Sequence, residues 1–232
     1  MGTFILFLTL AGMLAYLGYI ATTWWEYGTR RGSMILDPLL DRFLPDWEVA
    51  ERHEVEVCAP IDLTYLAFRA VDFEESPVIR LIIRLRRFVL RGKPGTYIGP
   101  RTALDRALAM GWGVLCDMPG RTLVLGAVTQ PWRPVPLFRA LPPAEFAAFN
   151  EPGYAKIVWS MAADEAGWNR SLGCTETRVK LTDPASRRRF RLYWALVSPG
   201  VLLIRRILLH RVRKEAELWC MGYPRAGVAS LR

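Results

Sequence analysis

The sequence has few residues suited to catalysis or to metal binding. Its 232 residues include only two histidines, His53 and His210, and neither has a carboxylate or a second histidine at the spacing of metal ligands. No nucleophile elbow, P-loop or dinucleotide fingerprint occurs. The sequence therefore predicts no catalytic residues, no metal and no cofactor, and we expect the chain not to be an enzyme.

Cysteine is also scarce, and its spacing excludes two further kinds of site. The four cysteines lie far apart and form no C-x-x-C pair, so neither a zinc knuckle nor a dithiol redox centre is encoded. Free thiols of this kind are typical of a reducing cytoplasm. The sequence also lacks internal repeats and low-complexity segments.

Acidic residues are outnumbered by basic ones. The chain has 31 lysines and arginines against 22 acidic residues, which gives a formal charge of +9. This balance predicts attraction to a polyanion, either nucleic acid or the anionic surface of a membrane. With 52% hydrophobic residues and nine tryptophans, the chain can bury one sizeable core and still have apolar sequence left over.

The surplus apolar sequence lies at the start of the chain. Residues 3–25, TFILFLTLAGMLAYLGYIATTWW, contain no charge and are numerous enough to cross the hydrocarbon core as a helix. A signal peptide would need a positive n-region, a shorter apolar stretch and a small-residue cleavage site, and none is present. We predict that residues 1–25 form a single transmembrane helix. Gly12, Ala15 and Gly18 would allow close contact with a partner helix, although solitary spans also contain small residues.

The residues that follow this helix indicate its orientation. Trp24 and Trp25 end the span where an interfacial aromatic belt belongs, and Arg30 and Arg31 come shortly after. These residues are the predicted interfacial anchor. Because the positive flank is on the C-terminal side, we expect the N-terminus outside and the domain in the cytoplasm, at the inner membrane.

Residues 26–50 form a connector with a short helical pattern. In DPLLDRFLPDW, Asp37 is a candidate N-cap and Pro38 occupies the first helical position, followed by leucines and phenylalanine on one side. Pro45 ends the pattern. Two interpretations fit equally well, a helix on the membrane surface and a linker helix packed on the domain.

Residues 51–219 carry the patterns of one folded domain, and residues 220–232 form a tail. Period-two alternation predicts a first strand from His53 to Val57. The later predicted elements are a helix after Ala59-Pro60, a second helix capped by Ser76 and stopped by Gly92, paired strands within 111–132 and 154–182, and a final helix starting at Asp183-Pro184. Pro199 should kink the final helix near its middle.

Two stretches resemble a known family. HEVEVCAPIDLTYLAF, residues 53–68, resembles the opening of START-like (SRPBCC, polyketide cyclase-like) domains. TETRVKLTDPASRRRFRLYWALVSPGVLLIRR, residues 175–206, is similar to the last strand and final helix of uncharacterised bacterial members. The resemblance implies an α+β helix-grip fold, in which a curved antiparallel sheet wraps around a long C-terminal helix with an apolar cavity between them. The family binds lipids, sterols, polyketides and other apolar molecules, and only some members are enzymes.

The strand patterns predict which side chains face such a cavity. The alternating residues of two strands and one aromatic residue of the final helix make up the set, namely Ile157, Trp159, Met161, Thr175, Thr177 and Trp194. Small threonines opposite large aromatics would leave a void for an apolar ligand. A closed core is the equally weighted alternative.

Arginines follow one side of the second predicted helix. Arg80, Arg84, Arg87 and Arg91 fall at offsets of four, three and four, and no acidic residue interrupts them. Next to a membrane anchor, this stripe predicts contact with anionic lipid headgroups. Nucleic-acid binding ranks well below, because no RNA- or DNA-reading motif is present. We therefore expect a lipid bilayer and no nucleic acid as partner.

Glu176 and Arg178 share one face of a predicted strand. They could form a buried acid-base pair, but an exposed cross-strand ion pair is the favoured interpretation.

Two classes of function remain. In the first, the chain is a membrane-anchored START-like module that binds an apolar molecule, of the lipid, quinone or pigment class, at the cytoplasmic membrane surface. In the second, it is a non-catalytic accessory subunit of a larger respiratory or photosynthetic membrane complex, with its helix and domain making protein contacts.

Overall fold

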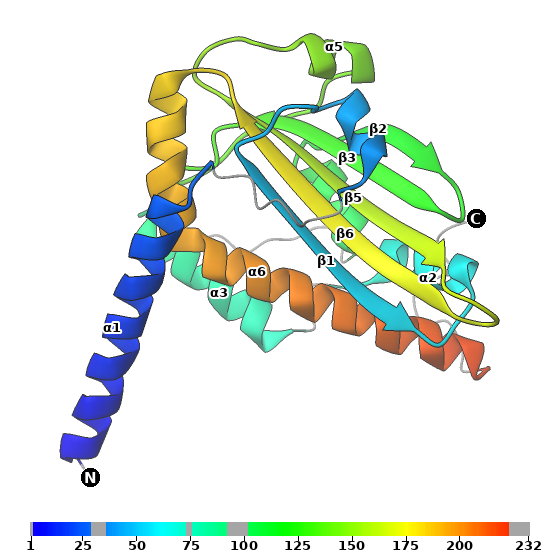
Figure 1. Cartoon of the computed structure of the whole chain (residues 1–232), viewed down its shortest axis with the longest axis horizontal. Coiled ribbons are helices and arrows are strands. Elements are labelled where there is room, and N and C mark those ends of the chain that lie inside the picture. Colours follow the sequence, from blue (N-terminus) through cyan, green and yellow to red (C-terminus); the bar gives the residue numbers. More distant parts are fainter. Residues whose placement is uncertain (1, 29–35, 73–75, 92–101, 223–232) are drawn as a thin grey trace.

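The computed structural model describes residues 2–28, 36–72, 76–91 and 102–222 as an α+β chain (Figure 1). The elements, in chain order, are α1 (Gly2–Trp25), η1 (Pro38–Arg42), β1 (Val49–Val57), α2 (Ile61–Ala70), α3 (Pro77–Val89), α4 (Ala103–Ala109), β2 (Gly113–Met118), β3 (Thr122–Thr129), β4 (Phe138–Arg139), α5 (Pro143–Ala148), β5 (Ala155–Glu165), β6 (Ser171–Leu181) and α6 (Pro184–Cys220). Helix α6 reaches the first residue of the predicted tail at 220–232, and residues 223–232 lie outside the described residues, as do the anchor arginines Arg30 and Arg31.

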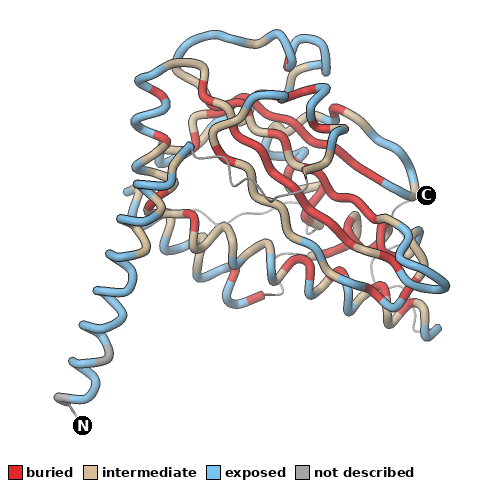
Figure 2. The backbone as a smooth tube through the Cα atoms, viewed as in Figure 1, coloured by how far each residue is buried: buried red, intermediate tan, exposed pale blue. Residues whose placement is uncertain are grey.

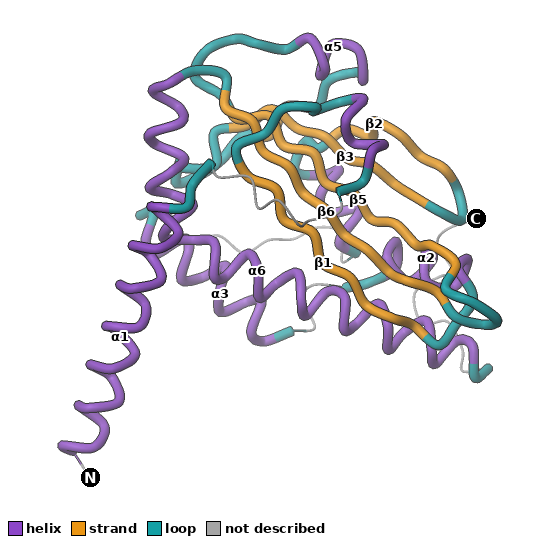
Figure 3. Tube along the Cα trace, viewed as in Figure 1, coloured by secondary structure: helices purple, strands orange, loops and turns teal. Residues whose placement is uncertain are grey.

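The strands form one antiparallel sheet in the order β1-β6-β5-β3-β2, with the short β4 paired to β3. The first and last strands are therefore neighbours, and β6 leads directly into α6, which crosses one face of the sheet (Figure 3). This confirms the predicted antiparallel sheet with a long C-terminal helix, the helix-grip arrangement. The first strand starts at Val49, earlier than the predicted His53.

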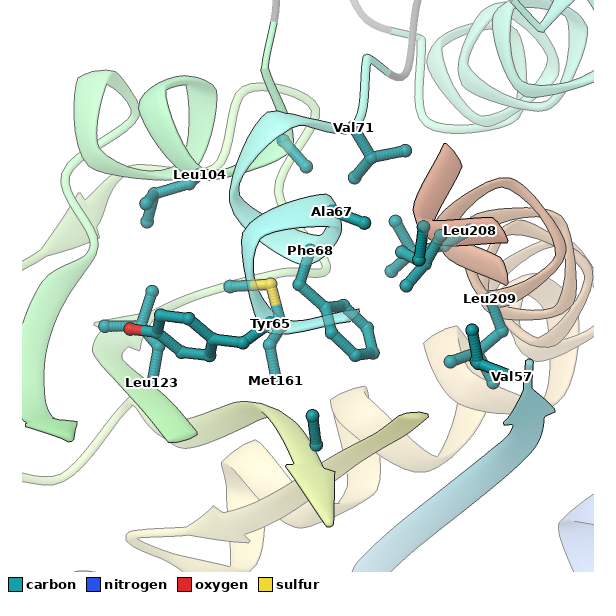
Figure 4. Packing of buried hydrophobic residues seen from close by; sticks show 14 of the residues in the cluster. Val57, Tyr65, Ala67, Phe68, Val71, Leu104, Leu123, Met161, Leu208 and Leu209 are labelled. Atoms are coloured by element: carbon teal, nitrogen blue, oxygen red, sulfur yellow. The ribbon is translucent and has the colours of Figure 1, made fainter. Parts of the chain in front are cut away.

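The main core lies between the sheet, α2 and the second half of α6. Figure 4 shows Phe68 of α2 between Met161 of β5 and Leu208 of α6. Leu209 and Val212 continue the buried side of α6 along the sheet. Their spacing of three and four residues is that of one helical face, which explains why α6 packs here.

The opposite face of the sheet is covered by the connector. Leu40 and Leu44 are buried against Val158 of β5 and Phe146 of α5. Asp37 caps η1 by accepting from the backbone N–H of Leu39 at 2.9 Å, as predicted. Of the two interpretations of the connector, the structure shows the one in which it packs on the domain.

This cover overturns one prediction. Glu176 and Arg178 point to the face beneath η1, and both side chains are buried rather than exposed. Arg178 Nε donates to Glu176 Oε1 at 2.7 Å, and Arg52 of β1 lies 3.2 Å from the other carboxylate oxygen. The expected exposed ion pair is therefore wrong. Strand periodicity identified the shared face, but it could not show that residues 37–44 would fold back over it.

Helix α6 is bent where Pro199 interrupts it, as predicted (Figure 1). Three segments meet at this bend. Tyr16 of α1 donates to the Leu196 carbonyl at 2.5 Å, and the Tyr19 hydroxyl lies 3.1 Å from that of Ser198. Ile82 of α3 packs closely on Gly200 of α6. A Cβ atom added at Gly200 would lie 2.7 Å from Cγ2 of Ile82.

Candidate functional site

A cavity of about 300 Å³ lies between the last turns of α1, the start of β1 and α6. Its walls combine aromatic rings with charged groups, including Tyr19, Tyr27, Trp47, Glu51, His53, Trp194 and Arg206. A second hollow of about 240 Å³ lies further along β1 and α6, and it shares His53 and Arg206 with the first. His53 and Arg206 therefore separate two spaces along the same edge of the sheet.

One wall of this cavity belongs to α1. The last turns of α1 are fixed to α6 by the two tyrosine hydroxyls at the bend. The guanidinium of Arg191 lies 4.4 Å from the ring centre of Trp24 and donates to the Trp24 backbone carbonyl. A cation at the C-terminal end of a helix interacts favourably with its dipole, so Arg191 secures the end of α1 that closes the cavity.

The opposite wall comes from β1, whose inner face carries two polar residues among valines. Glu51 pairs with Thr177 of β6, and His53 pairs with Thr175. Because alternate residues of a strand share a face, Glu51 and His53 lie on the same side as Val49 and Val55. Neither Glu51 nor His53 was predicted as a site residue. The signal available in the sequence was that both are polar residues on the apolar side of an alternating strand.

Burial changes the acid-base behaviour of this wall. The pKa of His53 is lowered first by burial and then by the positive charges of Arg205 and Arg206. The pKa of Tyr27 is raised by burial and by the nearby carboxylate of Glu48. Both groups are therefore held in their neutral forms, which can donate or accept hydrogen bonds to a bound molecule.

The residues predicted to line an apolar cavity lie together on the α6 side of the sheet. On β5, Ile157, Trp159 and Met161 stand opposite Val179, Thr177 and Thr175 of β6, respectively. Trp159 Nε1 donates to Thr175 Oγ1 at 2.8 Å, and Arg205 Nη2 donates to Thr177 Oγ1 at 2.5 Å. Trp194 stacks on Phe190 and is the member of the predicted set that lines the cavity between α1 and β1.

The predicted arginine stripe is largely on the outside of α3. Arg80, Arg84 and Arg91 are exposed and Arg87 is half-buried. Next to them runs an exposed apolar row, formed by Val78, Leu81, Leu85, Phe88 and Val89. Their spacing of three and four residues is visible in the sequence, but periodicity alone does not show that this row is exposed while Ile79 of the same helix is buried.

Among the residues that the structure describes, two helices are long and apolar enough to cross a membrane by length and composition, namely Phe4–Trp25 and Pro184–Cys220. The first is exposed along most of its length, whereas the second is partly buried against the sheet (Figure 2). At the end of α1, Trp25 is 83% exposed. Among the described residues, no group of three or more histidine, cysteine or acidic side chains is placed to hold a metal ion.

Comparison with known proteins gives structural neighbours only. No protein-family model and no curated protein sequence matches the chain. Among solved structures, CalU16 from Micromonospora echinospora is 11% identical, over 75% of this chain and 86% of that chain, with a TM-score of 0.26. The Zhui aromatase/cyclase from Streptomyces sp. R1128 is 14% identical, over 78% and 99%, with a TM-score of 0.28. Norcoclaurine synthase from Thalictrum flavum is 11% identical, over 76% and 88%, with a TM-score of 0.29.

Two of these neighbours are described as enzymes, an aromatase/cyclase and a synthase, and the prediction that the chain is not an enzyme is withdrawn. The prediction relied on the absence of short catalytic motifs. Catalytic groups that meet only in the folded chain leave no such motif, since they are recognised by geometry rather than by sequence position.

Proposed function

We propose that this chain is a membrane-attached helix-grip protein that binds a small amphipathic molecule in the cavity between α1, β1 and α6. The observation that carries this proposal is the dual role of α1. Its last turns close the cavity, while most of the described side chains before them are apolar and exposed. A ligand that partitions into a membrane would therefore meet the cavity at the point where the anchor joins the domain.

The membrane part of the proposal is supported by exposed apolar surface. Phe4, Phe7 and Leu14 are 67%, 68% and 61% exposed on α1. Side chains of this kind are stable in hydrocarbon, and a helix of 24 residues is about 36 Å long, enough to span it. In this arrangement the N-terminus is outside and the domain lies in the cytoplasm, following the positive flank of the span.

Helix α3 supports the same placement. Phe88 is 82% exposed and Leu81 is 54% exposed, and the arginine stripe runs beside them. An apolar row flanked by cations is the pattern of a helix that lies in the membrane interface. Each arginine near an anionic surface contributes on the order of 1 kcal/mol. The charge of the stripe therefore matches lipid headgroups, while Phe88 reaches the acyl boundary.

The cavity walls indicate the chemistry of the ligand. Trp47, Trp194 and Tyr27 offer ring surfaces for an apolar body, whereas His53 and Arg206 offer polar contacts at the sheet side. A purely apolar molecule would leave these polar groups unpaired, at a cost in binding free energy. An amphipathic molecule satisfies both parts of the cavity.

Native mass spectrometry of the full chain, extracted in mild detergent, tests the proposal. We expect a copurifying small molecule, lost in Trp194→Ala and retained in Trp168→Ala, because Trp168 is 97% exposed and far from the cavity walls. A change in the mass of this molecule during incubation would show turnover. Stoichiometric protein partners without a small molecule would instead favour a subunit of a larger membrane complex.

A further inference from the structure

Arg205 has an unusual position for an arginine. It lies on the side of α6 that faces the sheet, in line with the buried residues Ser198, Leu209 and Val212. Neighbouring positions on this side are filled by the apolar core. The guanidinium therefore points into the interior between α6 and the sheet, beside Thr177.

The guanidinium is only partly satisfied there. One nitrogen, Nη2, donates to the hydroxyl of Thr177 at 2.5 Å. The other two, Nε and Nη1, are buried and have no hydrogen-bond partner within the described part of the chain. Burial lowers the pKa of Arg205 to about 10, and the carboxylate of Glu51 opposes this effect. Buried donors without acceptors are costly, so this arrangement calls for an acceptor supplied from outside the described residues.

His53 adds a second unsatisfied group on the same side of the sheet. Its Nδ1 atom is buried and likewise lacks a hydrogen-bond partner in the described ranges. Arg205 and Arg206 both act on its charge. Arg205 and Arg206 therefore face this region as cations and His53 as a neutral imidazole, and Glu51 is the carboxylate that acts on the charge of Arg205. At this end of the cavity two cations meet one carboxylate, which favours a negative ligand group, whereas Glu26 and Glu48 line the side formed by the end of α1 and the start of β1.

The cavity reaches this region through β1. Glu51, His53 and Leu202 line the cavity, and Leu202 lies on α6 one turn before Arg205 and Arg206. Glu51 is also the cross-strand partner of Thr177, whose hydroxyl accepts from Arg205. Glu51 of the cavity wall is thus one cross-strand pair away from the residue that holds the Arg205 guanidinium, while Arg205 itself lies behind the wall residues.

We propose that Arg205, with Thr177 and His53, forms an oxyanion-binding subsite at the inner end of the cavity. The ligand would be an amphipathic acid, with its apolar body against the tryptophans and a carboxylate or phosphate group at the guanidinium. This inference rests on the proposed function, since it specifies the ligand class of the same cavity. Charge-assisted hydrogen bonds to an arginine would supply the specificity for an acid over an uncharged analogue.

Two probes that share a naphthalene ring distinguish the oxyanion-binding subsite from the binding cavity itself. The full chain in detergent is titrated with 2-naphthoate and with 2-naphthalenemethanol, with tryptophan fluorescence as the readout, and with inorganic phosphate as a free anion. We expect naphthoate to bind at least about tenfold more tightly than the alcohol, as for hydrogen bonds to a charged group. Arg205→Met should remove this preference without abolishing binding of the alcohol. Lys214→Met, an exposed change on the same helix, should preserve it.

Each result decides between the proposals. Equal binding of acid and alcohol by the parent chain overturns the subsite and leaves the binding cavity in place, and this comparison requires no variant. Binding of neither probe counts against the proposed function itself. A preference that survives Arg205→Met also overturns the subsite. Competition by phosphate at micromolar concentration would assign the subsite to a free anion rather than to the ligand, and it too would contradict the amphipathic acid.

Discussion

Arg178 donates through Nη2 to the backbone carbonyl of Asp37 at 2.7 Å, although 141 residues separate them. The backbone N–H of Asp37 in turn donates to Glu176 Oε2 at 2.8 Å. A charged pair on β6 therefore satisfies both backbone groups of one residue in the connector. This buried contact holds the start of η1 against β6.

Removing one member of the buried Glu176–Arg178 pair should destabilise the fold strongly. Arg178→Met leaves the Glu176 carboxylate buried without its main partner, and we expect a loss of about 3 to 5 kcal/mol in the free energy of unfolding. Replacing both residues with methionine should cost less, because no unpaired charge remains. Urea unfolding of the full chain in detergent measures both. A double variant that is less stable than Arg178→Met would contradict this account.

A methyl group at the bend of α6 should displace α3. Gly200→Ala places a Cβ 2.7 Å from Ile82 Cγ2, so we expect a net destabilisation of about 1 to 3 kcal/mol despite the better helix propensity of alanine. Gly18→Ala is the matched control, since nothing lies within 4 Å of its Cβ position, and it should not destabilise. Adding Ile82→Ala should restore part of the loss. Equal stability of the two single variants would show that α3 does not pack at the bend as described.

Lys156 should give stability a distinctive pH dependence. Burial, and then the charge of Lys180, lowers its pKa from 10.5 to about 8. Between about pH 8 and 10.5 the unfolded chain holds a proton that the folded chain has released, so the free energy of unfolding rises with pH in this window. Lys156→Met should lack this rise. The free energy of unfolding of the parent should therefore rise relative to that of Lys156→Met as pH increases.

Cys174 changes stability with pH in the opposite direction, and comparing the parent with Lys156→Met cancels its effect. Burial raises the pKa of the Cys174 thiol to about 12, which destabilises the folded state above about pH 9, but both chains share this cysteine. Urea unfolding at several pH values between 7.5 and 9.5 is the measurement. Parallel stability curves for the two chains would show that Lys156 titrates normally.

The exposed row of α3 should lie in the membrane interface. In full chains with Cys58→Ser, an environment-sensitive fluorophore on Phe88→Cys should be quenched by brominated lipids in nanodiscs. The same label on Trp168→Cys, at the exposed turn between β5 and β6, should not be quenched. Equal signals at both sites would mean that α3 faces water or is covered by a protein partner.

The positive charge of the arginine stripe should help to hold position 88 of α3 in the membrane interface. Changing Arg80, Arg84, Arg87 and Arg91 to glutamine should reduce quenching at position 88 in anionic bilayers and have little effect in neutral ones. Added salt should weaken the difference, because it screens exposed charges. Unchanged quenching in the glutamine variant would show that the arginines do not contribute and that the apolar row alone holds α3 at the membrane.

Periodicity in the sequence predicted most of the fold, because the strands and long helices each bury one continuous side. Pro199 identified the bend of α6, and alternation on β5 and β6 placed Trp159 on the same side as Thr177. The short helices α4 and α5 were missed, since so few residues carry no clear period.

The candidate site could be predicted only in part. Trp194 was identified by its place on the final helix, but the cavity it lines depends on α1 folding against β1. Arg205 was not identified as a site residue, because arginine side chains usually lie on the solvated surface. Only the packing of α6 on the sheet shows that this residue faces inward, and no local pattern records such long-range contacts.

The bend of α6 makes one helix support both the anchor and the sheet. A helix of 24 residues is about 36 Å long, whereas the hydrocarbon core is about 30 Å thick, and an excess of this kind is accommodated by tilting. If α1 spans the bilayer as proposed, a thinner membrane tilts it further. Because α1 carries the wall with Tyr19 and β1 carries the wall with His53, the width of the cavity would follow bilayer thickness. Lipid composition would then adjust ligand occupancy without altering any contact inside the domain.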